Sequence, residues 1–267
     1  MKCNMNGKYS ENLRKKYGKN ADPRIIDIVE NYDRYKIGLD ETFKFGCKMC
    51  GKCCINREDI ILNPKDLYNI AKELGKTIIE VVNEYCVCYI GPTSRFPIIK
   101  LKSVGIDKRC PLLVDHKCSV HKSKPTVCAL FPIGRSFVAN KGEALDQSKM
   151  DYIFIHPECG SENETHTVRE WLTAFGIPIE DNFHFEWTNI TTNVSAVLRD
   201  IEKRKDEETL ETLHRIIFMG VYSNYDTSIE FEPQFEANAR ATRAVVTLVQ
   251  TGELPEEYKK KGSGESA

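Results

Sequence analysis

Apolar residues recur at intervals of three or four along several stretches of the chain, and this spacing predicts amphipathic helices. Two of the helix starts carry a capping box, Thr77 with Glu80 and Thr167 with Glu170, in which each side chain satisfies a backbone N–H of the other residue. Glycine or a charged turn follows most of the apolar faces and ends the helices. The expected helices cover about 22–35, 64–74, 78–85, 168–175, 179–205, 207–219 and 233–250.

Shorter apolar or alternating runs lie between the first helices and predict strands. The strand candidates are 60–62, 86–88, 96–104, 112–114, 133–138 and 152–155. Strands therefore fall in the first part of the chain, and long helices dominate after Cys159. The pattern predicts an α+β fold in which a loop-rich cysteine domain with short strands packs against a mainly α-helical C-terminal half.

The same change of character after Cys159 is the one internal boundary that the sequence indicates. Polar, charged or Gly/Ser-rich ends are typical of frayed termini. We therefore expect a flexible N-terminal segment over 1–21, a cysteine-cluster metal-binding domain over 22–160, a helical C-terminal region over 161–258 and a disordered tail over 259–267.

Composition limits the function. A chain of 267 residues with 41% hydrophobic residues can bury a sizeable core, so it does not need a metal merely to fold. Its formal net charge of -1 gives no general attraction for nucleic acid, and no nucleic-acid partner is expected. No apolar stretch approaches the roughly 20 residues that span a bilayer, and the first residues lack the apolar core of a signal peptide. We expect a cytoplasmic protein with no membrane association.

Ten of the eleven cysteines lie between Cys47 and Cys159. In a reducing compartment such a concentration of thiols indicates metal ligands or redox groups rather than disulfides. Four of the ten fall within eight residues, at Cys47, Cys50, Cys53 and Cys54. This C-x2-C-x2-C spacing is typical of loops that bind metal ions or iron-sulfur clusters, and it supplies half of a site. Because adjacent side chains project in different directions, Cys53 and Cys54 are expected to serve different metals, or only one of them to bind.

The second half of the site must come from further along the chain. The best candidates are Cys110, which precedes a proline, then Cys118, His121 and Cys128, with Cys159 as a later ligand. An imidazole nitrogen is accepted by both zinc and iron, so His121 is either a ligand or a hydrogen-bonding neighbour of one.

Two arginines and two further cysteines lie close to these candidates in the sequence. Arg109 and Arg135 flank the second half and are candidates to stabilise thiolates. Cys86 and Cys88 are spaced too closely for the usual zinc knuckle, and we interpret them as buried or supporting thiols.

Together these motifs resemble the CxxCxxCC, or YkgJ-type, cysteine-cluster family. The resemblance rests on Phe45-Gly46-Cys47-x2-Cys50-Gly51-x-Cys53-Cys54, Cys110-Pro111-Leu112-Leu113, Cys118-Ser119-Val120-His121 and Lys124-Pro125-x2-Cys128-x2-Phe131-Pro132. That family is described as a zinc- or iron-chelating domain and is similar to the iron-sulfur region of bacterial flagellin lysine N-methylases. The resemblance implies that the seven cysteines in these fragments bind metal.

Three functions follow from these observations. The favoured one is an iron-sulfur centre, 4Fe-4S in particular, or a polynuclear iron centre used in redox or protein-modifying chemistry, because the candidate thiols outnumber the ligands of one tetrahedral ion. The protein would then be an iron-sulfur oxidoreductase or a protein-modifying enzyme acting on a protein or small-molecule substrate. The alternative is a zinc-stapled interaction module without catalysis. The resemblance adds lysine N-methyltransferase-like activity as a third.

Overall fold

The computed structural model describes residues 23–137, 143–204 and 206–259. The expected flexible segment 1–21 and all but the first residue of the expected tail 259–267 lie outside these residues. The chain folds into two compact units, each built from two separate stretches of sequence. Unit 1 combines Met1–Lys48 with Leu130–Glu180, and unit 2 combines Met49–Ala129 with Asp181–Ala267. These units do not coincide with the boundary expected near residue 160, because each unit takes segments from both sides of it.

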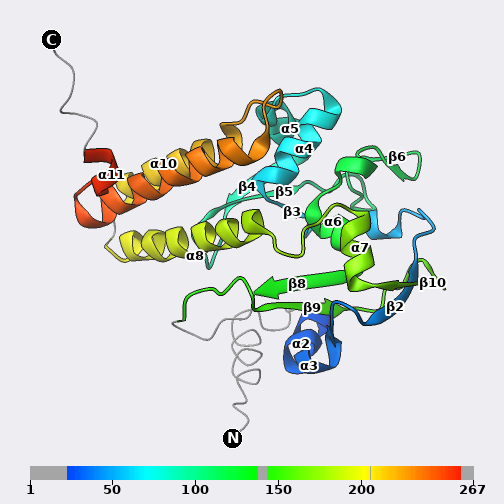
Figure 1. Cartoon of the computed structure of the whole chain (residues 1–267). Helices are drawn as coiled ribbons and strands as arrows, with labels where there is room; N and C mark the ends of the chain where they lie inside the picture. Colours follow the sequence, from blue (N-terminus) through cyan, green and yellow to red (C-terminus); the bar gives the residue numbers. More distant parts are fainter. Residues whose placement is uncertain (1–22, 138–142, 205, 260–267) are drawn as a thin grey trace, which may run out of the picture. The chain divides into compact units, whose positions relative to one another are not determined.

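Within the described residues, unit 1 contains two small antiparallel sheets and the helices α2, α3 and α7 (Figure 1). One sheet has the strand order β1-β9-β8, and the other pairs β10 with β2. Its core gathers buried aromatic and aliphatic side chains, among them Phe43, Phe45, Trp171 and Leu172. The elements of this unit are α2 (Pro23–Glu30), α3 (Tyr32–Tyr35), β1 (Lys36–Ile37), β2 (Thr42–Gly46), β8 (Ile133–Phe137), β9 (Met150–Phe154), β10 (Ser161–Thr167) and α7 (Val168–Ala174).

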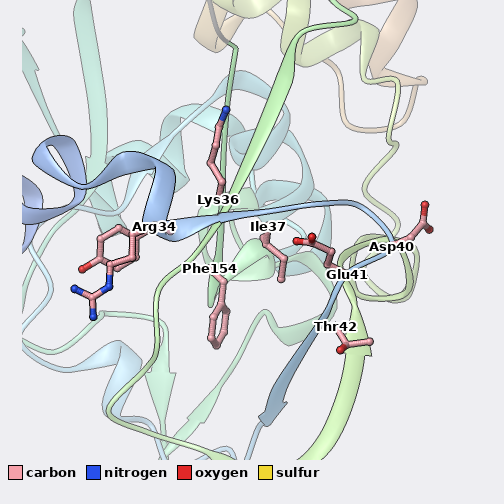
Figure 2. Close-up of a pocket in the computed structure, with 8 residues that line it drawn as sticks. Arg34, Lys36, Ile37, Asp40, Glu41, Thr42 and Phe154 are labelled. Carbon is pink, nitrogen blue, oxygen red and sulfur yellow. The ribbon is translucent and has the colours of Figure 1, made fainter. Parts of the chain in front are cut away.

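Unit 1 also has an open pocket, shown in Figure 2. Three of its charged side chains form contacts within the unit: Lys36 with Asp151 at 2.7 Å, Asp40 with Arg169 at 2.7 Å, and Glu41 with the amide of Gly38 at 2.7 Å. The pocket is lined by Arg34, Tyr35, Lys36, Ile37, Asp40, Glu41, Thr42 and Phe154. None of these residues belongs to the predicted metal site.

The first part of unit 2 holds most of the candidate ligands. A three-stranded sheet, with strand order β3-β5-β4, is accompanied by two capped helices and by several short turns. Its elements are η2 (Lys52–Cys54), β3 (Ile61–Leu62), α4 (Pro64–Leu74), α5 (Ile78–Tyr85), β4 (Cys86–Ile90), β5 (Pro97–Leu101), β6 (Leu113–Val114), β7 (Lys117–Cys118) and η3 (His121–Ser123). The last helix of this region, α6 (Thr126–Leu130), ends at the start of unit 1.

The second part of unit 2 is helical. Figure 1 shows α8 and α10 as its two long helices, and aromatic contacts of Phe183 in α8 with Phe231 and Phe235 in α10 join them. Ile190, Val194, Leu198 and Ile201 are buried at helical spacing, so one face of α8 enters the core. The elements are α8 (Asn182–Lys203), α9 (Glu207–Ile217), the π-helix η4 (Phe218–Ser223), α10 (Phe231–Thr251) and α11 (Glu256–Lys259).

A single hydrophobic core joins both parts of unit 2. It contains side chains of α4, α5 and the three-stranded sheet together with side chains of α8, α9, η4 and α10. Tyr222, for example, donates a hydrogen bond from η4 to the carbonyl oxygen of Pro97 in β5 at 3.1 Å. This architecture confirms the expected α+β class and the largely helical C-terminal half. Within the described residues, no helix has the length and apolar character needed to cross a bilayer.

Candidate metal centre

The first cysteine motif begins where strand β2 ends, at Gly46. The backbone then takes left-handed conformations at Met49, with φ 48°, and at Gly51, with φ 71°. Gly51 precedes the 3-10 turn η2, in which the amide of Cys54 donates to the carbonyl oxygen of Gly51 at 2.8 Å. Gly51 can adopt its left-handed conformation at little cost, because it has no Cβ.

The adjacent cysteines of this turn have their sulfurs in contact. The Sγ atoms of Cys53 and Cys54 are 3.9 Å apart and share a hydrogen bond. This bond lowers the pKa of Cys53 and raises the pKa of Cys54, because the proton stays on one sulfur while the other becomes a thiolate. The positive charges of Arg57 and Lys124 also lower the pKa of Cys53. Cys53 is therefore the sulfur of the pair that ionises first.

Cys110 is joined directly to this turn. Its amide donates a hydrogen bond to the carbonyl oxygen of Cys54 at 2.7 Å, next to an isolated bridge between Val104 and Arg109. Burial raises the pKa of the Cys110 thiol, and backbone N–H groups of Leu112 and Leu113 partly oppose this by hydrogen bonding to the sulfur. The residues after Cys110 thus supply donors to its side chain.

Cys118 lies in a short hairpin formed by β6 and β7, opposite Leu113. The amide and hydroxyl of Ser119 both donate to the carbonyl oxygen of Leu112, at 2.9 and 3.0 Å, which closes the hairpin. Burial raises the pKa of Cys118, while the N–H of Val120 and the charge of Lys124 lower it. Like Cys110, this sulfur receives a backbone hydrogen bond from a residue that follows it.

Cys128 lies in the short helix α6 and packs against the core of unit 2. Burial raises the pKa of its thiol to about 12, and the charges of Cys110 and Asp66 add to the shift. Arg57 acts in the opposite direction. The Cys128 sulfur is therefore a neutral thiol in the metal-free protein at neutral pH.

Five of the predicted ligand thiols of unit 2 are thus close enough to form one network of interacting ionisations: Cys53, Cys54, Cys110, Cys118 and Cys128. Cys50, on the same segment as the first two, is exposed. Among the described residues no three His, Cys, Asp or Glu side chains are yet converged as a metal site. The sulfurs of the cluster lie in one region of unit 2. The cysteine side chains would have to rotate to bind one ion together.

Cys47 and Cys159 belong to unit 1 and lie at the same end of the β2–β10 ladder. The pairing of Gly46 with Ser161 places these cysteines just beyond the last paired residues of the two strands. Gly160 lies so close to β2 that a Cβ there would be 2.8 Å from the carbonyl oxygen of Gly46. The ligand roles of Cys47 and Cys159 stay predictions.

His121 lies in the turn η3 with most of its side chain exposed. The partial desolvation of its ring, assisted by the charge of Lys124, lowers its pKa. The neutral imidazole that a metal would need is therefore favoured, and its ligand role also stays a prediction. Cys86 is buried in β4, as expected of a supporting thiol, whereas Cys88 two residues later is exposed. None of the ten described cysteines forms a disulfide bond.

The cations that act on the cysteines are Arg57 and Lys124, which the sequence interpretation missed. It pointed instead to Arg109 and to Arg135, a residue of strand β8 in unit 1. The signal was present, because Arg57 follows Cys54 closely and Lys124 opens the segment that leads to Cys128. Both residues lie in irregular segments next to the cysteines, and Arg57 is also paired with Asp59 at 2.6 Å.

The donor set suits a thiophilic metal. Thiolates select zinc, Cu(I) and iron-sulfur clusters over hard cations. The 3.9 Å between the sulfurs of Cys53 and Cys54 is close to the separation of about 3.8 Å that two thiolates on one tetrahedral zinc would have, given Zn–S bonds of about 2.3 Å. Adjacent cysteines therefore do not have to serve different metals. Backbone N–H groups at Cys110 and Cys118 are the outer contacts that metal-bound sulfur receives in proteins.

Comparison with known proteins gives one match. No curated protein and no solved structure matches the chain. The similarity to lysine N-methylases stays a prediction. Residues 46–159, which include all the predicted ligands, match the model of the family described as "CxxCxxCC: Putative zinc- or iron-chelating domain".

Proposed function

We propose that the protein binds iron through its cysteine cluster, as an iron-sulfur centre or a polynuclear iron centre, and uses it in redox or protein-modifying chemistry. The observation that carries the proposal is the group of five mutually interacting thiols in unit 2, Cys53, Cys54, Cys110, Cys118 and Cys128. One tetrahedral zinc uses four ligands, so five thiols exceed its need even before Cys50 is added.

The surroundings of the sulfurs support an anionic cluster. Hydrogen bonds to cluster sulfurs and nearby charges set the reduction potential of iron-sulfur centres. Here backbone N–H groups reach Cys110 and Cys118, and Arg57 and Lys124 provide positive charge near Cys53. These groups would offset the negative charge of bound thiolates and favour the reduced state of a centre.

The same proposal implies a reducing compartment, because ligand thiols must be kept from oxidation. A cytoplasmic location fits this need. In such a protein the iron centre would act as an oxidoreductase site or assist the modification of a protein side chain, and the largely helical segment 181–259 of unit 2 would contribute to substrate binding.

A zinc-stapled interaction module is the second candidate, and a specific observation favours it. The thiols come from short, separate pieces of chain: the 3-10 turn η2, the loop before Cys110, the β6–β7 hairpin and helix α6. Pieces this short contribute little stability of their own, and a zinc ion bound by four thiolates would cross-link them. In this case the metal is structural and the surface of unit 2 binds a partner.

One preparation distinguishes the two. Protein purified without oxygen is analysed for iron, zinc and acid-labile sulfide, and its visible spectrum is recorded before and after dithionite. Iron with sulfide and absorption that dithionite bleaches are expected. A colourless protein that holds zinc alone would refute the iron proposal and support the zinc module. Protein without either metal, even after anaerobic reconstitution, would refute both.

A further inference from the structure

Asp66 is a buried acid in the first turn of α4, with only 3% of its surface exposed. One carboxylate oxygen, Oδ2, accepts a hydrogen bond from the amide of Asn63 at 3.1 Å and completes the cap of that helix. The other oxygen, Oδ1, accepts two bonds from a different part of the chain. They come from the amide of Thr126 at 2.8 Å and from its hydroxyl at 2.7 Å.

Thr126 is the first residue of α6, and Cys128 follows two positions later. The amides of Cys128 and Ala129 both donate to the carbonyl oxygen of Pro125, at 2.8 and 2.9 Å, so the turn from Pro125 onward is held as one piece. A bond that fixes Thr126 therefore also fixes the backbone from which the Cys128 thiol projects.

Capping of α4 alone does not account for this arrangement. The capping box needs only Oδ2 and the Asn63 side chain, which accepts from the amide of Asp66 at 2.8 Å. Oδ1 accepts both bonds from Thr126. Hydrogen bonds to a charged acceptor are short and strong, and a buried carboxylate is stable only while it keeps them. The carboxylate therefore ties α6 to α4 at the point where the cysteine segment begins.

We infer that Asp66, acting through Thr126, is the positioning residue that holds the Cys128 thiol in place for metal binding. This inference rests on the proposed function, since it assigns Asp66 a task only if Cys128 is a ligand. It concerns the chain's own geometry and applies whether the metal is iron or zinc.

The test uses Thr126→Val, which keeps the volume and the amide bond to Asp66 and removes the hydroxyl, with Thr126→Ser as the conservative variant. Glu80→Gln is the matched control, because Glu80 caps α5 through Thr77 in the way that Asp66 caps α4. The full-length proteins are titrated with cobalt(II) and zinc(II) under reducing conditions, and sulfur-to-cobalt absorption is followed. Alkylation of each cysteine in the metal-free proteins is measured by peptide mass spectrometry.

Loss of contacts that orient metal ligands typically weakens metal binding about 10–100-fold, and a loss of this size is expected for Thr126→Val. Alkylation of Cys128 should accelerate severalfold while that of Cys118 stays unchanged. Thr126→Ser and Glu80→Gln should match the wild-type protein in both measurements. Asp66→Asn keeps the shape of the side chain but loses one acceptor oxygen, and it should weaken metal binding more than Thr126→Val does. It takes the place of Thr126→Val in the test if that variant does not fold.

The outcomes distinguish a failure of the inference about Asp66 and Thr126 from a failure of the proposed function. If wild-type protein binds cobalt(II) and Thr126→Val binds it equally well with unchanged Cys128 alkylation, the inference is refuted and the proposed function stands. If Cys118 and Cys128 become equally reactive, Thr126 has only a general structural role and the inference is again refuted. Wild-type protein that binds neither metal would refute the proposed function and the inference together.

Discussion

The amide of Cys110 donates a hydrogen bond to the carbonyl oxygen of Cys54 at 2.7 Å, and this bond joins the two halves of the cysteine motif. The halves are far apart in the sequence, yet a single backbone contact sets the position of one against the other. Because the contact uses main-chain atoms, it forms irrespective of the state of the thiols. The metal-free protein therefore already has these two segments aligned.

The first prediction concerns the ligand role of Cys110. Cys110→Ser should lower the bound iron or zinc well below wild type, because the hydroxyl is a poor ligand for a thiophilic metal while the backbone bond to Cys54 is kept. Cys88→Ser is the control, since Cys88 is an exposed cysteine outside the cluster. Metal analysis of both proteins after anaerobic purification checks this. Equal metal content in the two variants would contradict it.

The second prediction concerns the Cys53–Cys54 pair. Removing the thiol donor in Cys54→Ala should raise the pKa of Cys53, because the hydrogen bond from Cys54 is the largest cause of its lowered value. Alkylation of Cys53 in reduced, metal-free protein should then begin at higher pH than in wild type. Arg57→Met should shift the profile in the same direction by less. Rates measured at each pH by peptide mass spectrometry test the order, and an unchanged profile in Cys54→Ala would rule out the shared proton.

The third prediction concerns stability in alkali. The Cys128 thiol ionises near 9 when unfolded but at about 12 in the folded, metal-free protein. Between these values the folded state binds more protons, so the free energy of unfolding falls as pH rises. The stabilising contribution is fully present below pH 9 and is lost as the pH approaches 12. Cys128→Ser cannot titrate, and the stability difference between wild type and this variant should therefore shift with pH in favour of the variant.

Urea unfolding of both metal-free proteins at several pH values between 8 and 11 measures that difference. Tyrosine and lysine titrations occur in both proteins and cancel. A difference that does not change with pH would show that Cys128 is not protected from ionisation by burial.

The fourth prediction concerns the core of unit 2. Leu198 in α8 is 0% exposed, and Leu198→Ala should lower the free energy of unfolding by about 2–5 kcal/mol through the cavity that it leaves. Leu248 in α10 is 38% exposed, so Leu248→Ala should cost much less. The fluorescence of Trp187 in a Trp171→Phe background reports on unit 2, because Trp187 contacts Phe96 and Tyr222. Similar costs for the two substitutions would contradict the burial assigned to α8.

The fifth prediction concerns the turn beside Cys159. Gly160 has φ 83°, and a Cβ there would lie 2.5 Å from Phe45, whereas Gly252 has φ 78° and open space around it. Gly252→Ala should cost about 1–2 kcal/mol, the usual penalty of a left-handed alanine. Gly160→Ala must also displace Phe45 and should cost more. Trp171 contacts Phe45, so its fluorescence in a Trp187→Phe background follows unit 1 and the Gly160 variant. Gly252 belongs to unit 2, so its variant is followed by Trp187 in a Trp171→Phe background. A smaller cost at Gly160 would contradict the close approach.

Local signals in the sequence predicted most of the helices. The capping boxes at Thr77 and Thr167 form as expected, and Gly75 ends α4 in a left-handed conformation. These features depend on residues within one or two turns, so sequence alone can predict them. The short strands at Ile61–Leu62 and Ile133–Phe137 also fall within the expected ranges.

The β2–β10 pair was not predicted, and the reason is physical. Strand β10, Ser161–Thr167, is almost entirely polar and exposed, so it shows no alternation of apolar residues. Its partner β2 has alternating buried phenylalanines, but it lies outside the predicted strands. Their pairing is a long-range contact, and the local sequence of neither segment predicts it. The discontinuous units were missed for the same reason.

The sequence predicted the residue types that form the candidate site, but not the residues that hold them in position. Cysteine spacing identifies thiols such as Cys110 and Cys128 because metal binding restricts that spacing. Asp66 gave no such signal, since an acid in the first turn of a helix is ordinary. Only the fold shows that this carboxylate bonds to Thr126.

The discontinuous construction of unit 2 affects the order of events during synthesis. Cys50 to Cys128 leave the ribosome well before Ile190 to Val246, which supply the other half of the same core. Until the later helices emerge, the core against which Cys110, Cys118 and Cys128 pack lacks the side chains of α8, α9, η4 and α10. The nascent chain therefore exposes reactive thiols for as long as translation of the remaining residues takes. This interval is when a metal or a chaperone would first meet them.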